Sequence, residues 1–217
     1  MDFSAARRNM VESQVRPNQV TDDRVIAALE EVPREAFVPE AFKGIAYIDE
    51  DIGIGNGRTI LAPMVFARLL QAAQLDPAEI VLDVGCGTGY SAAVLARLAS
   101  TVIALESDRA LMQRAQTLLA DQGADNVALV EGPLAEGDKA HGPYNAIIVE
   151  GAVARLPDAL LAQLADLGRL VAVTARPGEV SRATLTLRVG DSFTTRPLFD
   201  ASATMLPGFA VRPGFVF

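Results

Sequence analysis

The feature that most constrains the fold is the stretch from Ile80 to Tyr90, which reads I-V-L-D-V-G-C-G-T-G-Y. It begins as a short apolar run typical of a buried strand and then turns on three alternating glycines, Gly85, Gly87 and Gly89. An apolar pattern with helical spacing follows over residues 92–98. A strand, a glycine turn and a helix form the first half of a βαβ unit, which binds ligands at the carboxyl edge of a parallel sheet. The sequence therefore predicts a nucleotide-type site at this turn.

The positions of two acidic residues indicate which nucleotide is bound. A dinucleotide fingerprint can be placed on Gly87, Gly89 and Ala92, but Asp83 would then lie well inside the run before the first glycine. Read as D-x-G-x-G-x-G, the segment puts Asp83 at the end of the strand, where a carboxylate suits a cationic amine. Glu106 closes the next apolar run and can accept both hydroxyls of a ribose. We therefore expect S-adenosylmethionine; the alternative is that the two acids are a helix cap and a solvated strand end.

Composition narrows the class of protein. The chain has 217 residues, half of them hydrophobic, which predicts one domain with a full core. A net charge of −8 argues against binding to nucleic acid or to an anionic membrane. No run approaches the roughly 20 apolar residues of a membrane span. With one cysteine, Cys86, and one histidine, His141, no Cys/His zinc cluster and no metal site are expected, and the lone cysteine fits a cytoplasmic protein.

Strands alternate with helical patterns through the middle of the chain, which predicts a parallel sheet with right-handed crossovers. The expected strands are 80–84, 101–105, 127–130, 144–149 and 169–174. The expected helices are one beginning at Pro63 and others at about 89–99, 109–121 and 157–165. After Pro177 the pattern becomes polar and apolar in alternation, and Gly190-Asp191 predicts the turn of an antiparallel hairpin between Ala183–Val189 and Ser192–Phe199.

The N-terminal part predicts a helical cover followed by a long loop. One helix is expected over residues 2–16 and a second from an N-cap at Thr21 to Val32. The next stretch, to Pro63, is rich in aromatic residues, Pro and Gly, and a structured loop of this length is usually functional. It is expected to be a lid or a substrate wall; the alternative is a cover that packs on the sheet edge.

These elements predict a doubly wound, Rossmann-like class I methyltransferase sheet, mostly parallel with a C-terminal antiparallel hairpin. We expect a single domain over residues 1–217. Its parts are the N-terminal helices and substrate-side loop (1–61), the S-adenosylmethionine-binding core (62–176) and the C-terminal hairpin and tail (177–217).

Several segments resemble the protein-L-isoaspartate O-methyltransferase family, over nearly the whole chain. The glycine segment is shared by many S-adenosylmethionine enzymes, whereas V-P-R-x-x-F-V-P and G-x-T-I are more particular to this family. The matching segments are Met10–Gln14, Val32–Pro39, Ala46–Asp49, Ile54–Ile60 with Pro63, Leu82–Leu95 and Tyr144–Val149.

The resemblance implies methylation of the side-chain-like carboxylate of isoaspartyl residues in damaged proteins, which begins their repair. It implies S-adenosylmethionine as cofactor and an isoaspartyl protein or peptide as substrate; the oligomeric state stays open. Thr59 and the backbone near Ile60 are the candidates for positioning the substrate carboxylate. Arg58 is either a further attractor of that carboxylate or a solvated surface arginine. The expected cofactor contacts are Asp83, Gly85, Cys86, Gly87, Gly89, Tyr90, Glu106, Ser107, Gly132 and Pro133.

Three departures from the family pattern bear on this function. The family's T-I-S ends here in Leu61, its G-D-G is Gly132-Pro133-Leu134, and its T-A-A is Glu150-Gly151-Ala152. A polar partner lost from a buried site costs on the order of 1–3 kcal/mol, so the substrate or the cofactor affinity can differ. Two alternatives therefore stay open: a methyltransferase for another carboxylate or small molecule, and a non-catalytic protein that binds the cofactor.

Overall fold

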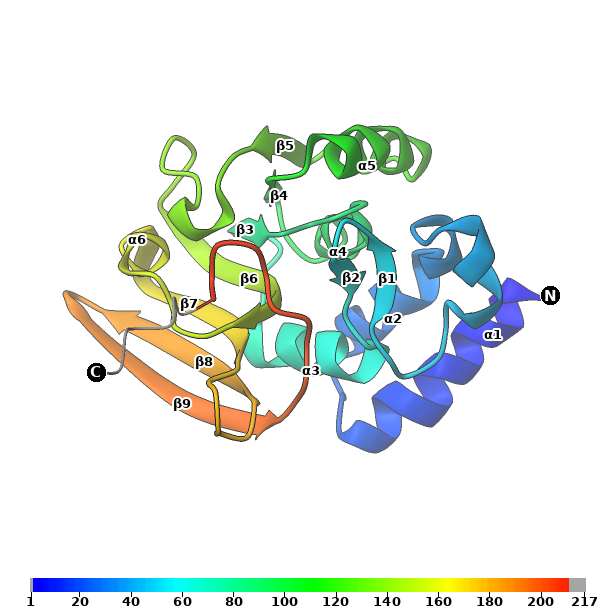
Figure 1. Ribbon diagram of the computed structural model, residues 1–217, viewed down its shortest axis with the longest axis horizontal. Helices are drawn as coiled ribbons and strands as arrows, with labels where there is room; N and C mark the ends of the chain where they lie inside the picture. Colours follow the sequence, from blue (N-terminus) through cyan, green and yellow to red (C-terminus); the bar gives the residue numbers. More distant parts are fainter. Residues whose placement is uncertain (1, 211–217) are drawn as a thin grey trace, which may run out of the picture.

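The structure, a computed structural model, describes residues 2–210. Its centre is a seven-stranded sheet in the order β5-β4-β3-β6-β7-β8-β9 (Figure 1). Strands β3 to β7 are parallel to their neighbours, whereas β8 is antiparallel to β7 and β9 is antiparallel to β8. The strands are β3 (Ile80–Val84), β4 (Thr101–Glu106), β5 (Val127–Glu131), β6 (Tyr144–Val153), β7 (Leu164–Thr174), β8 (Arg182–Val189) and β9 (Ser192–Asp200). The expected mostly parallel sheet with an antiparallel C-terminal hairpin is confirmed.

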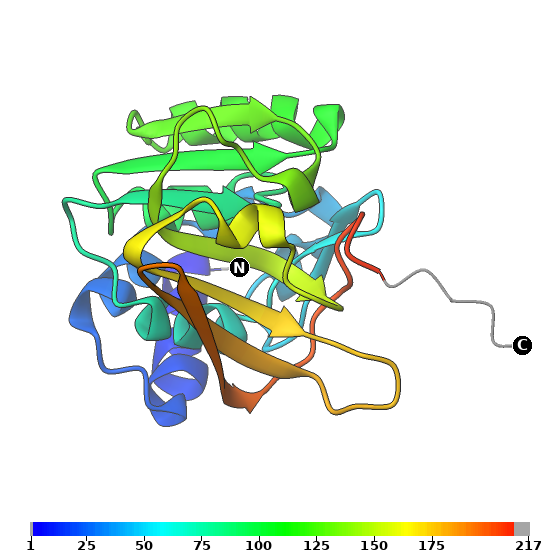
Figure 2. The same ribbon diagram turned by 90° about the vertical axis from the view of Figure 1, so that its left-hand side faces the viewer.

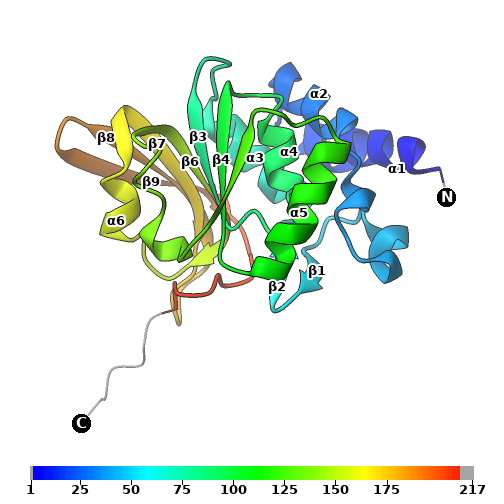
Figure 3. The same cartoon turned by 90° about the horizontal axis from the view of Figure 1, so that it is seen from above.

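Helices cover both faces of this sheet, as Figure 3 shows from above. Helices α3, α4 and α5 pack on one face together with the N-terminal helices, and α6 packs on the other. Side chains alternate between the faces along each strand: Val81 faces α4, and Leu82 joins the cluster around α6. The α-helices are α1 (Phe3–Met10), α2 (Asp23–Glu31), α3 (Pro63–Ala73), α4 (Tyr90–Leu95), α5 (Arg109–Asp121) and α6 (Asp158–Leu161).

The expected long loop between α2 and α3 has more regular structure than its composition suggests. It contains two 3₁₀ helices, η3 (Arg34–Ala36) and η4 (Glu40–Ile45), and a short antiparallel hairpin of β1 (Ile52–Gly55) and β2 (Arg58–Ile60). The first helix also changes form, because α1 continues into a π-helical turn, η1 (Val11–Val15), and a 3₁₀ turn, η2 (Arg16–Asn18). Turn η1 packs on α3, and Phe37, which follows η3, packs on Tyr90 of α4.

Several predicted boundaries are wrong. The helix expected over 157–165 ends at Leu161, because Leu164 pairs with Tyr144 in the β6–β7 ladder. The leucines of this segment have a spacing typical of a helix, so the early start of β7 at Leu164 was not predicted. Strand β6 runs on to Val153 instead of ending at 149. The cap of α2 is Asp22 rather than Thr21, because its carboxylate accepts the N–H of Arg24 at 2.9 Å.

Two segments meet at the carboxyl edge of the parallel strands: the β1–β2 hairpin and the chain after β9 (Figure 2). The C-terminal segment is tied to the end of β6, because Ala152 donates to the Thr204 carbonyl at 2.8 Å and accepts from Leu206 at 2.9 Å. Both segments thus reach the edge where the glycine turn leaves β3. Among the helices of residues 2–210, none has the length and apolar character needed to cross a membrane. The division of the chain into one domain with three parts stays a prediction.

Candidate active site

The glycine turn joins β3 to α4 and adopts the tight form expected from the sequence. Gly85, Gly87 and Gly89 all have positive φ, at 85°, 57° and 94°. A Cβ on Gly87 would lie 2.5 Å from Cδ1 of Ile54, so the β1–β2 hairpin packs directly on the turn. Positive φ and this close contact both require glycine at position 87.

Asp83 lies at the end of β3 and is fully buried. Its Oδ2 accepts a hydrogen bond from Oγ of Ser91 at 2.7 Å, whereas its Oδ1 has no partner. Burial and, to a lesser extent, the nearby Glu106 raise the pKa of Asp83, and the Ser91 hydrogen bond opposes them; the pKa is about 7. A buried carboxylate oxygen without a partner is costly, so Asp83 suits an additional donor or cation.

Glu106 ends β4 and is also fully buried. Its Oε2 accepts the N–H of Gly87 at 2.8 Å, and its Oε1 accepts the N–H groups of Ser107 and Asp108 at 2.7 and 3.0 Å. The carboxylate therefore joins the glycine turn to the start of α5. The expectation that Asp83 and Glu106 lie near the same turn agrees with the structure, and neither is solvated.

Arg58 of β2 was expected either to attract the substrate carboxylate or to be a solvated surface arginine. It is 3% exposed, so the interpretation as a solvated surface arginine is wrong. Its Nη1 lies 2.7 Å from Oε1 of Glu106, and its Nη2 donates to the carbonyl of Gly85 at 2.8 Å. The only signal in the sequence was its position between Gly57 and Thr59. The structure brings this cation into the predicted cofactor site.

Glu150, one of the departures from the family pattern, is a buried acid of the site that was not predicted from the sequence. It lies in β6, is 5% exposed, and its Oε1 has no hydrogen-bond partner. Burial and the neighbouring Asp83 hold the pKa of Glu150 well above its usual range. The next residue, Gly151, leaves room for Leu206, whose Cγ would lie 2.7 Å from a Cβ at that position.

Tyr90 and Cys86 lie on the side of the turn that faces the protein core. The Tyr90 ring packs against Phe37 and Phe66, with centroids 5.7 and 5.8 Å away, and the guanidinium of Arg34 lies 5.0 Å from its centroid. The Tyr90 side chain thus supports the N-terminal cover. Cys86 is 5% exposed, and burial raises the pKa of its thiol, which disfavours a nucleophilic role.

The remaining predicted cofactor contacts lie at the ends of β4 and β5. Ser107 is exposed, and its Oγ is 3.3 Å from Oε1 of Glu106. The N–H of Gly132 donates to the Glu106 carbonyl at 3.1 Å, and the exposed Pro133 begins the 3₁₀ turn η5 (Leu134–Glu136). Proline has no N–H, so position 133 offers neither a carboxylate nor a backbone donor.

Thr59 and Ile60 lie in β2, next to Arg58. The half-buried Thr59 has its Oγ1 3.4 Å from Oδ2 of Asp51, whereas the Ile60 side chain is buried in the core. Leu61 is completely buried, and its carbonyl accepts Nη2 of Arg34 at 2.8 Å. The leucine at the family's serine position therefore packs in the core.

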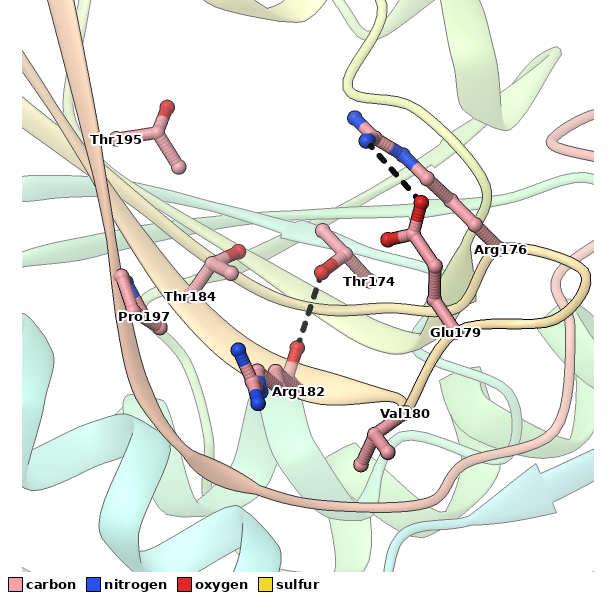
Figure 4. Close-up of a pocket in the computed structure, with 8 residues that line it drawn as sticks. All are labelled: Thr174, Arg176, Glu179, Val180, Arg182, Thr184, Thr195 and Pro197. Atoms are coloured by element: carbon pink, nitrogen blue, oxygen red, sulfur yellow. Dashed lines mark hydrogen bonds and ion pairs between the residues drawn. The ribbon is translucent and has the colours of Figure 1, made fainter.

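Two cavities lie near the carboxyl edge, and neither includes the glycine turn. One of about 510 Å³ lies between the start of α3 and residues 200–204, and Asp51 and Thr204 are among its lining residues. The other, of about 450 Å³, lies by the β7–β8 connection (Figure 4). There Arg176 and Glu179 face each other at 3.9 Å. Arg182 is paired with Asp200. Charges at this second cavity are thus already matched.

Comparison with known proteins decides the family. A family model described as protein-L-isoaspartate(D-aspartate) O-methyltransferase matches residues 5–189. The chain is 43% identical over 169 residues to protein-L-isoaspartate O-methyltransferase 1 of Rhodopseudomonas palustris, covering 78% of this chain and 69% of that protein. The chain belongs to the protein-L-isoaspartate O-methyltransferase family. A Roseiflexus member of the family is 39% identical over 209 residues, covering 96% of this chain and 94% of its own length.

Solved structures agree on the fold of this methyltransferase family member. A protein-L-isoaspartate O-methyltransferase superposes with a TM-score of 0.82 at 24% identity, over 93% of this chain and 66% of its own length. A Plasmodium falciparum protein of this description, solved with S-adenosyl-L-homocysteine, gives 0.78 at 22% identity, over 95% and 98% of the two chains. The expected fold and family are confirmed, and with them the expectation of an S-adenosylmethionine-dependent carboxyl methyltransferase.

The residues at the turn match the charge of S-adenosylmethionine. Asp83 and Glu150 each hold a buried oxygen without a partner, and both oxygens suit a cationic ligand. Glu106 presents a carboxylate at the end of β4, where a ribose binds in doubly wound folds. The guanidinium of Arg58 lies at the same place, where it bonds to Glu106 and donates to the Gly85 carbonyl.

Proposed function

We propose that this chain transfers a methyl group from S-adenosylmethionine to the side-chain-like carboxylate of L-isoaspartyl residues in damaged proteins. The observation that carries the proposal is the family match over residues 5–189, which includes β3, the glycine turn and Glu106. The bound cofactor supplies a methyl group already activated by a sulfonium. The protein then has to orient the reactants and exclude water.

We propose that Glu106 accepts the ribose hydroxyls and that backbone groups of Gly85, Gly87 and Gly89 lie against the rest of the cofactor. Asp83 and Glu150 would face its amino group, since each has a free buried oxygen. Cys86, Tyr90, Ser107, Gly132 and Pro133 complete the proposed cofactor site. Of these, Cys86 and Tyr90 contribute by backbone and packing, because their side chains are buried.

We propose that Thr59 and the backbone at Ile60 position the substrate carboxylate. This role is supported by the place of β2, which carries both residues beside the glycine turn. A carboxylate with an ordinary pKa near 4 is ionised at neutral pH, so no base is needed to activate it. The β1–β2 hairpin and the C-terminal segment would keep water from the reacting oxygen, since both cover the carboxyl edge.

The setting of this reaction is also a proposal. A net charge of −8 supports a polypeptide partner rather than nucleic acid. A single cysteine, which is buried and free, supports a cytoplasmic location.

The test is transfer of labelled methyl to an isoaspartyl peptide, with its aspartyl twin as substrate control. The matched variants are Glu106→Gln and Glu131→Gln, because Glu131 is the register neighbour of Glu106 on β5 but is exposed. We expect label on the isoaspartyl peptide alone, a loss of at least about tenfold in kcat/KM for Glu106→Gln, and little change for Glu131→Gln. Cofactor binding without transfer to either peptide would refute the isoaspartyl substrate.

A further inference from the structure

Arg58 lies where a ligand of the glycine turn has to approach. A Cβ built on Gly85 would be 2.7 Å from Nη2 of Arg58, so the guanidinium lies against the face of the turn that glycine leaves open. Leu206 borders the same place, with Cδ2 3.4 Å from that Cβ position. The chain thus fills this space with its own side chains.

The same guanidinium uses acceptor capacity of Glu106 that a ribose needs. A carboxylate has about four lone-pair positions. Oε1 of Glu106 already accepts Nη1 of Arg58 and the N–H groups of Ser107 and Asp108, whereas Oε2 accepts only the N–H of Gly87. Four donors thus share about four positions, and the departure of Arg58 frees one of them for a ribose hydroxyl.

The charge balance allows a cationic ligand to take the place of Arg58. The carboxyl and guanidinium side chains buried among residues 2–210 are those of three acids, Asp83, Glu106 and Glu150, and two arginines, Arg34 and Arg58. Removing Arg58 alone would leave Glu106 without its ion pair, which is unfavourable in a buried site. The ammonium group that S-adenosylmethionine and S-adenosyl-L-homocysteine share would bring a positive charge to the site, where Asp83 and Glu150 each have an oxygen without a partner.

We propose that Arg58 competes with the cofactor for Glu106 and thereby determines cofactor affinity in this chain. The guanidinium occupies the site in the absence of ligand and turns away from Glu106 and Gly85 when the cofactor binds. The measured affinity is then the intrinsic affinity multiplied by the fraction of molecules in which Arg58 is away. This inference rests on the proposed function, because it takes S-adenosylmethionine as the ligand of the turn.

The test is calorimetric titration of S-adenosyl-L-homocysteine into the wild type and Arg58→Gln. Arg109→Gln is the matched control, because Arg109 follows the same end of β4, is exposed and loses the same charge. We expect Arg58→Gln to bind at least about tenfold more tightly than the wild type, and Arg109→Gln to bind like the wild type. Should thermal melting show that Arg58→Gln is unfolded, Arg58→Lys keeps the buried charge with a weaker hold on Glu106 and is expected to bind more tightly than the wild type.

Equal or weaker binding by a folded Arg58 variant, or no binding by any variant, would overturn the proposed competition. Methyl transfer to the isoaspartyl peptide is measured on the same preparations. Transfer by the wild type together with unchanged affinity in Arg58→Gln would leave the proposed function intact and reject this inference. Tighter binding without transfer would support the competition and reject the isoaspartyl substrate.

Discussion

The backbone N–H of Thr204 donates to Oδ2 of Asp51 at 3.2 Å, across 153 residues of sequence. The other oxygen of Asp51 accepts the N–H of Ala62 at 2.9 Å, at the start of α3. One carboxylate therefore joins the N-terminal cover, α3 and the C-terminal segment at the edge where the glycine turn lies. We therefore expect the cover over the proposed site to depend on this contact.

Asp51→Ala is expected to lower the free energy of unfolding by about 1–3 kcal/mol, because it leaves two backbone N–H groups without their acceptor. Urea unfolding at neutral pH measures the change. The control is Glu50→Ala, since Glu50 is an exposed neighbour, and a change within about 0.5 kcal/mol is expected there. Equal effects of the two variants would show that Asp51 does not hold the segments together.

Asp83 predicts a particular pH dependence of stability. Its folded-state pKa of about 7 lies above its ordinary value of 3.8, so the folded protein binds the proton more tightly than the unfolded chain. The free energy of unfolding should therefore fall as pH rises from about 4 to about 7, by an amount on the order of a few kcal/mol from this group. Asp83→Asn keeps an acceptor for Ser91 and removes this contribution, so its stability relative to the wild type should increase between pH 5 and pH 8.

Urea unfolding of the wild type and Asp83→Asn at both pH values measures that difference. Asp125→Asn, at an exposed position, should follow the wild type. If the free energies of unfolding of Asp83→Asn and the wild type changed in parallel over this range, the raised pKa of Asp83 would be contradicted.

Arg34 is expected to be one of the most sensitive positions outside the glycine turn. It is completely buried, its Nε donates to the carbonyl of Ala46 at 2.7 Å, and its Nη2 donates to that of Leu61. Lysine has a single ammonium group and cannot make both bonds in the geometry of the guanidinium fork, so Arg34→Lys should lose at least about 2 kcal/mol of unfolding free energy. Arg155→Ala removes an exposed ion pair and should change the free energy of unfolding by less than about 1 kcal/mol. Thermal and urea unfolding compare the two, and a small effect at Arg34 would contradict its structural role.

Leu61→Ser restores the hydroxyl of the family pattern, yet it should not improve catalysis. The Leu61 side chain is completely buried in the main hydrophobic cluster, so the variant creates a cavity and buries a hydroxyl. We expect a loss of about 2–5 kcal/mol in unfolding free energy and no gain in methyl transfer. A stable variant with faster transfer would show instead that position 61 faces the substrate.

Local patterns in the sequence predicted the centre of the molecule well. The strand, glycines and helix of residues 80–98 are neighbours in the chain, and Glu106 directly ends the next strand, so spacing alone placed them at one edge. The alternation after Pro177 likewise predicted the hairpin of β8 and β9, which is confirmed.

Contacts between distant segments were not visible in the sequence. Arg58 stands in a glycine-rich hairpin and meets Gly85 and Glu106 only because that hairpin folds onto the turn, 27 and 48 residues away in sequence. Glu150 follows the apolar run 146–149, and its burial was not predicted; the C-terminal segment is bonded to β6 two residues further on, at Ala152. The early start of β7 at Leu164 depended on pairing with Tyr144, which periodicity does not reveal.

The central claim is that the glycine turn and Glu106 form the cofactor site of this methyltransferase. A crystal structure of the protein with S-adenosyl-L-homocysteine tests it most directly. We expect the ribose to be bonded to the Glu106 carboxylate, the ligand to lie along Gly85 to Gly89, and the Arg58 guanidinium to be turned away from Glu106. A ligand bound in another cavity, with Glu106 still paired to Arg58, would contradict the claim.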